Sequence, residues 1–201
     1  MSNQEIRVFE ATIKGAQLLM HNGQLADPLN QWTKRLKEES SRKKKSDDDN
    51  LRIAEIEFKG GLYFTEDLGP YIPGHMLDAV LVAGARKKKL GKVFESCVRT
   101  TQDGYALTYT GPRTRKDLWE DPRFRDRRGC GVQTSRVIRT RPKFTDWSVT
   151  FDVSLFPCEL NPNDLEQAIV DAGIYVGIGD FRPRFGTFSL ADFKAAKKGK
   201  A

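Results

Sequence analysis

The stretch WSVTFDVSL, residues Trp147–Leu155, alternates apolar and polar side chains from its first residue to its last. Successive side chains of a strand point to opposite faces of the sheet, so a period of two predicts a β-strand with one buried and one solvated face. Such a strand needs an apolar layer against one face only. Segments before and after it in the chain are candidates for that layer.

Two segments have the apolar spacing of amphipathic helices. In the later one, Asn161 and Pro162 suit an N-cap and a first helical position, and Gly173 suits a helix end. Its apolar stripe is Leu165, Ala168, Ile169 and Ala172. The earlier helix begins after Pro73, and its stripe is Met76, Leu77, Val80, Leu81 and Ala85.

Shorter apolar runs predict further strands at about 6–14, 62–64, 132–141 and 185–190, and a hairpin around Asp103-Gly104 within a β-rich segment at 93–110. The main elements then follow the β-α-β-β-α-β order of ferredoxin-like folds. The sequence therefore predicts an α+β protein with an RRM-like antiparallel sheet and helices on one face. The other face is left free, and RNA-recognition motifs bind single strands on that face.

We expect one domain over residues 1–193, because no long linker divides the chain. Two charged insertions interrupt it, at about 24–61 and 111–131. Residues 34–50 are nearly all charged, and such a block is usually solvated and mobile. A helix at Leu51–Lys59 is expected to return the chain to the body, and Gly69–Gly74 to form a rigid turn. The basic tail, 194–201, is expected to be disordered.

The 201 residues contain 34 Lys and Arg against 27 Asp and Glu, a formal net charge of +7 with a pI near 9.3. A basic surface favours polyanions such as nucleic acid, although the same charge also serves solubility. No run approaches about 20 apolar residues, and the polar N-terminus predicts no signal peptide. Cys97, Cys130 and Cys158 are odd in number and far apart, which favours reduced, buried thiols in a cytoplasmic protein.

The candidate phosphate contacts without an intervening acid are Arg136, Arg139, Arg141 and Lys143. Guanidinium groups bind phosphate in a bidentate fork and stack on bases. Upstream, Arg113–Arg128 interleaves basic residues with Trp119 and Phe124, but its four acids also fit an ordinary salt-bridged surface. The segment Arg86–Lys92 fits a solvated helix end as well as a phosphate contact. Electrostatic capture of a strand is expected from Lys43, Lys44 and Lys45.

The segment Gly177–Phe188, GIGDFRPRFGTF, is rich in glycine, arginine and phenylalanine. Its glycines would let a backbone approach closely and offer amides to phosphate, its arginines supply charge, and its phenylalanines are candidates for stacking on bases. The candidate contacts are Gly177, Gly179, Arg182, Arg184 and Phe185. The same pattern fits a glycine-rich turn whose aromatic side chains pack inward.

The chain has no GxSxG, Walker or HExxH sequence. The two histidines, His21 and His75, are single, and either fits a general base in a nuclease, although a lone turn histidine is more often structural. Neither lies at ligand spacing from a cysteine, so we predict no metal site and no cofactor. The protein is predicted not to be an enzyme.

Three pieces resemble the RAMP superfamily, the RRM-like backbone and processing subunits of CRISPR effector complexes. They are the opening strand with Gly15–Met20, the helix entry Tyr71–Leu77, and the glycine-rich segment Gly177–Phe188, in which Thr187 replaces the family's final basic residue. Over nearly its full length, most clearly at Leu19–Pro28 and Gly179–Gly186, the chain also resembles a family of small uncharacterised bacteriophage proteins. This second resemblance implies a viral protein in the host cytoplasm.

The RAMP resemblance implies a ferredoxin-like palm with two protrusions, in subunits that stack head to tail along a strand. The predicted function is sequence-independent binding of single-stranded RNA or DNA by a homo-oligomer, a filament or ring that coats the strand, without a membrane partner. Two alternatives remain open. One is a RAMP-type endoribonuclease, and the other is a phage structural or host-defence-interacting protein without nucleic-acid affinity.

Overall fold

The computed structural model describes residues 5–132 and 135–196. The chain divides into two compact units, each made of separate stretches of sequence. Unit 1 comprises Met1–Leu18, Tyr71–Thr110 and Thr145–Ala201, and unit 2 comprises Leu19–Pro70 and Gly111–Phe144. The sequence predicted one domain with two insertions, and both predicted insertions, 24–61 and 111–131, fall in unit 2.

The protein is α+β and has antiparallel strand pairs. The strands are β1 (Arg7–Leu19), β2 (Phe64–Thr65), β3 (Gly69–Pro73), β4 (Val98–Thr100), β5 (Gly104–Ala106), β6 (Arg125–Val132), β7 (Ser135–Leu155) and β8 (Ser189–Ala195). The α-helices are α1 (Gln31–Ser40), α2 (Asp47–Gly61), α3 (Gly74–Ala85), α4 (Gly91–Cys97), α5 (Arg115–Glu120) and α6 (Pro162–Tyr175). Three short 3-10 helices are η1 (Gly23–Ala26), η2 (Arg86–Lys88) and η3 (Pro122–Phe124).

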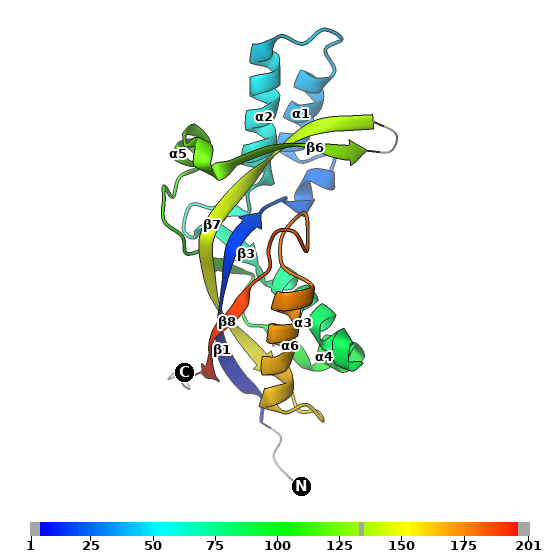
Figure 1. The fold of residues 1–201 in the computed structure, drawn as a ribbon, viewed down its shortest axis with the longest axis vertical. Helices are drawn as coiled ribbons and strands as arrows, with labels where there is room; N and C mark the ends of the chain where they lie inside the picture. Colours follow the sequence, from blue (N-terminus) through cyan, green and yellow to red (C-terminus); the bar gives the residue numbers. More distant parts are fainter. Residues whose placement is uncertain (1–4, 133–134, 197–201) are drawn as a thin grey trace. The chain divides into compact units, whose positions relative to one another are not determined.

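Unit 1 is built on a sheet with the strand order β4-β7-β1-β8. Antiparallel pairs join β1 to β8 and β4 to the end of β7. The helices α3 and α6 pack on each other and contact β4 and β8, respectively, so they cover one face of the sheet (Figure 1). The alternation predicted in Trp147–Leu155 is confirmed, because its five apolar side chains are buried and the four between them are not.

Both predicted helices of unit 1 are confirmed. The Asn161 side chain caps α6 by accepting hydrogen bonds from the amides of Asn163 and Asp164. The helix runs two residues past the predicted end at Gly173, to Tyr175. Where α3 crosses α6, a Cβ at Gly84 would lie 2.2 Å from the Ala168 carbonyl oxygen, so the crossing depends on a residue without a side chain.

Several local predictions are wrong. Residues 91–97 form α4 rather than part of a β-rich segment, and Gly69–Pro73 is a strand rather than a turn. The segment at Asp103-Gly104 is not the turn of a hairpin, because β4 pairs with β7 whereas β5 pairs with β3. The last strand is 189–195, so it includes the first residues of the predicted tail, and residues 197–201 of that tail lie outside the described residues.

Unit 2 contains a helical hairpin, α1 and α2, and a β-hairpin in which β6 pairs with residues 135–142 of β7. Its core side chains include Met20, Phe58, Leu118, Phe124 and Phe144. The prediction of a mobile block at 34–50 is wrong, because residues 34–40 belong to α1 and residues 47–50 to α2. The predicted helix at 51–59 is confirmed as the body of α2.

Candidate nucleic-acid interface

Positive charge is concentrated in unit 2. Its sequence has 20 Lys and Arg against 14 Asp and Glu, whereas unit 1 has 14 against 13. Within unit 2, the β6–β7 hairpin from Arg125 to Lys143 has seven basic residues and a single acid, Asp126. The hairpin therefore has a net charge of +6, close to the +7 of the whole chain.

The predicted phosphate contacts on β7 divide between the two faces of this hairpin. Alternate residues of a strand share a face, so Arg139, Arg141 and Lys143 lie on one face and Arg136 lies on the other. In the antiparallel register, Arg139 is opposite Arg128. We call the side with Arg128, Arg139 and Arg141 the paired face, and the side with Arg136 the open face.

Two guanidinium groups on the paired face, those of Arg128 and Arg139, have acidic partners. Arg139 Nη1 donates a hydrogen bond to Glu57 Oε1 at 2.6 Å. Arg128 donates two hydrogen bonds to Asp126, and this carboxylate raises the pKa of the Arg128 guanidinium. Sequence reasoning missed Glu57 because it lies in α2, 82 residues from Arg139, and no local pattern connects the two. The charge of this face is thus partly neutralised.

The open face, defined by Arg127, Gly129, Gly131, Arg136 and Ile138, is exposed. Within residues 5–132 and 135–196, no carboxylate pairs with Arg127 or Arg136. A Cβ on either glycine would meet nothing within 4 Å, so the strand backbone is bare, and Ile138 is 59% exposed. Glycine inside a strand often marks a place where a ligand approaches closely. The open face combines charge, accessible backbone and apolar surface.

The aromatic residues upstream of the hairpin have structural roles. The Arg125 guanidinium lies 4.8 Å from the centre of the Trp119 ring, which in turn contacts Phe58. Phe124 is buried in an edge-to-face contact with Phe144. These contacts fix the base of the hairpin.

The segment between α6 and β8 uses much of its backbone within unit 1. The Ile178 amide donates to the Gly186 carbonyl, and the Gly186 amide donates to the Gln17 carbonyl, both at 2.8 Å. The Gly177 amide donates to the carbonyl of Ala172. Gly177 and Gly179 adopt positive φ angles of 74° and 84°. The hydrogen bonds of these amides close a tight loop. This agrees with the alternative interpretation of the segment as a glycine-rich turn.

The side chains of this segment divide by exposure. Arg182 and Arg184 are exposed, and Arg182 Nη1 lies 3.4 Å from the Gly177 carbonyl oxygen. Phe185 is only 7% exposed and packs edge-on against Phe181. The base-stacking role expected of Phe185 is therefore wrong, because apolar burial leaves its ring no free face. Phe181, in contrast, is 42% exposed.

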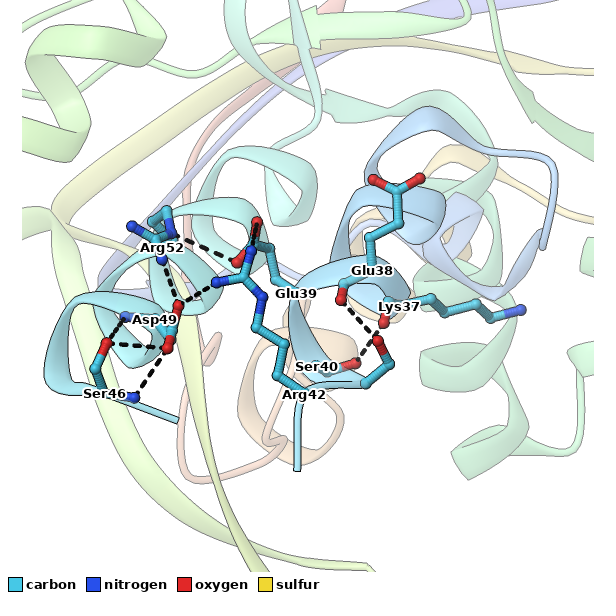
Figure 2. Close-up of polar contacts among 9 residues, drawn as sticks. Lys37, Glu38, Glu39, Ser40, Arg42, Ser46, Asp49 and Arg52 are labelled. Carbon is cyan, nitrogen blue, oxygen red and sulfur yellow. Dashed lines mark hydrogen bonds and ion pairs between the residues drawn. The ribbon is translucent and has the colours of Figure 1, made fainter. Parts of the chain in front are cut away.

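The predicted lysines Lys43–Lys45 are exposed in the loop between α1 and α2. An ion-pair cluster holds the helix ends beside this loop (Figure 2). Arg42 lies 2.6 Å from Asp49 and 3.5 Å from Glu39, and Arg52 contacts the same two carboxylates. These contacts close the helical hairpin and present the three lysines at its tip.

This cluster predicts a pH dependence of stability. Hydrogen bonds from Ser46, with further contributions from Arg52 and Arg42, lower the pKa of Asp49 from 3.8 to about 2. The stabilisation is therefore present above about pH 4 and is lost as the pH falls towards 2. We expect Asp49→Asn to lower the urea midpoint at pH 7 and to lose less stability than the wild type between pH 4 and 2. Identical profiles for Asp49→Asn and the wild type would contradict this, and Asp47→Asn is the control.

A cavity of about 440 Å³ in unit 2 brings His21 beside two of the predicted arginines. Its lining residues are His21, Gly23, Leu25, Ala26, Leu36, Glu57, Arg139, Thr140 and Arg141. We call it the His21 pocket. The other histidine, His75, lies exposed in the first turn of α3 in unit 1.

The solvated face of the unit 1 sheet has three carboxylates near Lys194. Glu10 and Asp192 both pair with Lys194, at 2.8 and 2.9 Å. Asp152 lines the same shallow cavity as Glu10 and Lys194, and burial, together with the Glu10 charge, raises the pKa of Asp152.

Neither a scan of protein-family models nor a search of curated proteins finds a match to this chain. Over the described residues, no helix combines the length and apolar character needed to cross a membrane. In the same part of the chain, no three His, Cys, Asp or Glu side chains gather in a way that could hold a metal ion. The three cysteines are free thiols, but they are partly exposed rather than buried as expected.

Proposed function

We propose that the protein binds single-stranded nucleic acid, RNA or DNA, through the open face of the β6–β7 hairpin. The observation that carries this proposal is the +6 charge of the hairpin, with Arg127 and Arg136 exposed on its open face. Basic side chains neutralise phosphates and release counterions, which gives affinity without dependence on sequence. The exposed Ile138 favours a single strand, because it offers apolar surface to an unstacked base.

A ferredoxin-like arrangement of unit 1 belongs to the same proposal. It is supported by the sheet order β4-β7-β1-β8 and by the positions of α3 before β4 and of α6 before β8 in the chain. The RAMP resemblance adds subunits that stack head to tail and coat the strand as a filament or ring. The phage resemblance adds a viral protein that acts in the host cytoplasm.

Fluorescence anisotropy with labelled single-stranded RNA, single-stranded DNA and duplex of equal length tests the function. We expect the single strands to bind more tightly than the duplex, with affinity that falls steeply between low and moderate salt. Negative-stain imaging of the same samples tests for filaments or rings. A folded protein that binds none of the three would contradict the proposal and favour the interaction-protein alternative.

Arg182 and Arg184 provide a second test. Their replacement together by alanine is expected to weaken single-strand binding by roughly tenfold without changing the fold, because both side chains are exposed. We expect a smaller loss of affinity than for substitution of the hairpin arginines, because the positive and negative charges of unit 1 are nearly balanced. Anisotropy measures the affinity and circular dichroism the fold. Unchanged affinity would remove Gly177–Phe188 from the binding site.

The His21 pocket favours one second candidate, a metal-independent ribonuclease. An imidazole beside two guanidinium groups places a group able to transfer protons next to groups able to hold a phosphate. RNA cleavage in the presence of a chelator, lost in His21→Ala and kept in His75→Ala, would support this candidate. Intact RNA after incubation under conditions of full binding would exclude it.

A further inference from the structure

A run of four basic residues, Arg86–Lys89, follows the end of α3 in unit 1. All four side chains are exposed. Arg86 pairs with Glu95 at 3.1 Å. Within residues 5–132 and 135–196, however, no carboxylate pairs with the three lysines of the run. These three charges therefore face solvent without an acidic partner in the described part of the chain.

The packing of α3 on α6 brings this run to an exposed aromatic ring. The two helices lie side by side (Figure 1), and a Cβ on Gly84 would lie 2.8 Å from Ala172 Cβ. Lys87 and Tyr175 stand three residues after these two positions, and Lys87 Nζ lies 4.7 Å from the centre of the Tyr175 ring. Tyr175 is 57% exposed. We call Lys87–Lys89 and Tyr175 together the Tyr175 surface.

The Tyr175 ring suits stacking on a nucleobase. The Lys87 ammonium group holds the ring through a cation–π contact, and more than half of the residue stays accessible. Proteins that bind single strands without sequence preference combine such rings with basic side chains, because every base has a π-face and every nucleotide has a phosphate. Phe185, for which the sequence predicted this role, is buried in the same unit.

The backbone of Lys89 adopts a conformation that favours glycine. Its φ is +63° and its ψ is +17°, in the left-handed region. The Lys89 amide donates to the Arg86 carbonyl, and the next amide, of Leu90, donates to the Ala85 carbonyl. Glycine is the usual residue at such a helix end, because a Cβ is unfavourable there. Strained residues of this kind occur at functional sites, and a role for the Lys89 charge agrees with its presence here.

We propose that the Tyr175 surface is a second contact for the bound strand, in which Tyr175 stacks on a base and Lys87–Lys89 bind the neighbouring phosphates. The proposal rests on the proposed function and deepens it, because it adds a base-stacking residue of unit 1 to the phosphate contacts of the hairpin. The total charge of unit 1 is nearly balanced, so general attraction does not account for such a contact. The clustering of three lysines beside one exposed ring carries the proposal.

The first experiment tests the stacking on Tyr175 by fluorescence anisotropy. Tyr175→Leu removes the ring, whereas the matched variant Tyr175→Phe keeps it. We expect Tyr175→Leu to bind an unmodified single strand about tenfold more weakly, and to bind an abasic strand of equal length as the wild type does. Tyr175→Phe should bind both strands like the wild type. Unchanged affinity of Tyr175→Leu for the unmodified strand would overturn the stacking role.

The second experiment tests the phosphate contacts with Lys89→Gly. Loss of the charge should weaken single-strand binding about fivefold and reduce the slope of log affinity against log salt by about 0.7. The urea midpoint should not fall, because relief of the positive φ offsets the greater flexibility of glycine in the unfolded chain. The control is Lys14→Gln, which removes one charge from an exposed strand residue of the same unit. Equal losses of affinity in the two variants would overturn the contact at Lys89.

The outcomes separate the Tyr175 surface from the proposed function. If Tyr175→Leu and Lys89→Gly bind like the wild type while Arg127→Glu with Arg136→Glu loses affinity, the Tyr175 surface is overturned and the function of the open face stands. If the first two variants lose affinity and the hairpin variant does not, the Tyr175 surface is supported and the open face is overturned. A folded protein that binds no strand overturns both.

Discussion

The double substitution Arg127→Glu with Arg136→Glu is expected to weaken single-strand binding at least a hundredfold at low salt. Each arginine lost removes a charge-assisted hydrogen bond worth about 1.5–3 kcal/mol, or roughly tenfold to a hundredfold in affinity, and each glutamate adds repulsion. Loss of two phosphate contacts should also reduce the slope of log affinity against log salt by about 1.4. The fold should be unaffected, because both side chains are exposed.

A matched control separates a defined site from general attraction. Lys34→Glu with Lys116→Glu makes the same change in net charge on exposed helical positions of unit 2. Anisotropy titrations at several salt concentrations measure both variants. If the two double variants lose affinity equally, binding depends on overall charge, and the open face is not the contact surface.

The substitution Gly186→Ala is expected to destabilise the protein by at least about 3 kcal/mol. Gly186 has a φ of +77°, which costs any other L-residue energy, and a Cβ there would lie 1.7 Å from the Ile178 carbonyl oxygen. That oxygen belongs to the backbone of the loop, so the clash cannot be relieved by moving a side chain. Urea unfolding followed by circular dichroism measures the loss.

Gly129→Ala is the contrasting variant. A Cβ at Gly129 would meet nothing within 4 Å, so its stability should stay within about 0.5 kcal/mol of the wild type. Wild-type stability in Gly186→Ala would show that the loop between α6 and β8 does not need glycine at this position. The structure would then not explain why glycine occupies these positions of the loop.

The parts of the fold that could be predicted are those whose signal is local. The strand Trp147–Leu155 and the helix after Asn161 each bury one regular stripe of side chains, and the period of that stripe is visible in the sequence. The charged block at 34–50 was mispredicted because charge alone indicates solvation. Ion pairs such as Arg42 with Asp49 and Arg52 with Glu39 join the ends of two helices, and no local pattern reveals them.

In the candidate site, too, only features with a local sequence signal could be predicted. The basic run on β7 could be predicted from composition, but its division between two faces depends on the register with β6. Glu57 could not be identified as a partner of Arg139, because the helix pattern does not distinguish a buried acid from an exposed one. The approach of His21 to these arginines likewise comes from tertiary structure.

The order of the two units along the chain affects which parts of the protein can fold first during translation. The chain crosses between them four times, and the last residue of unit 2, Phe144, is synthesised before the end of β7 and the whole of β8. In the sheet of unit 1, β1 lies between these two strands, so it has neither neighbour complete until late in translation. Domains generally fold as units, the N-terminal ones first, during synthesis. In a nascent chain, the β6–β7 hairpin can therefore form before β1 has both of its neighbouring strands.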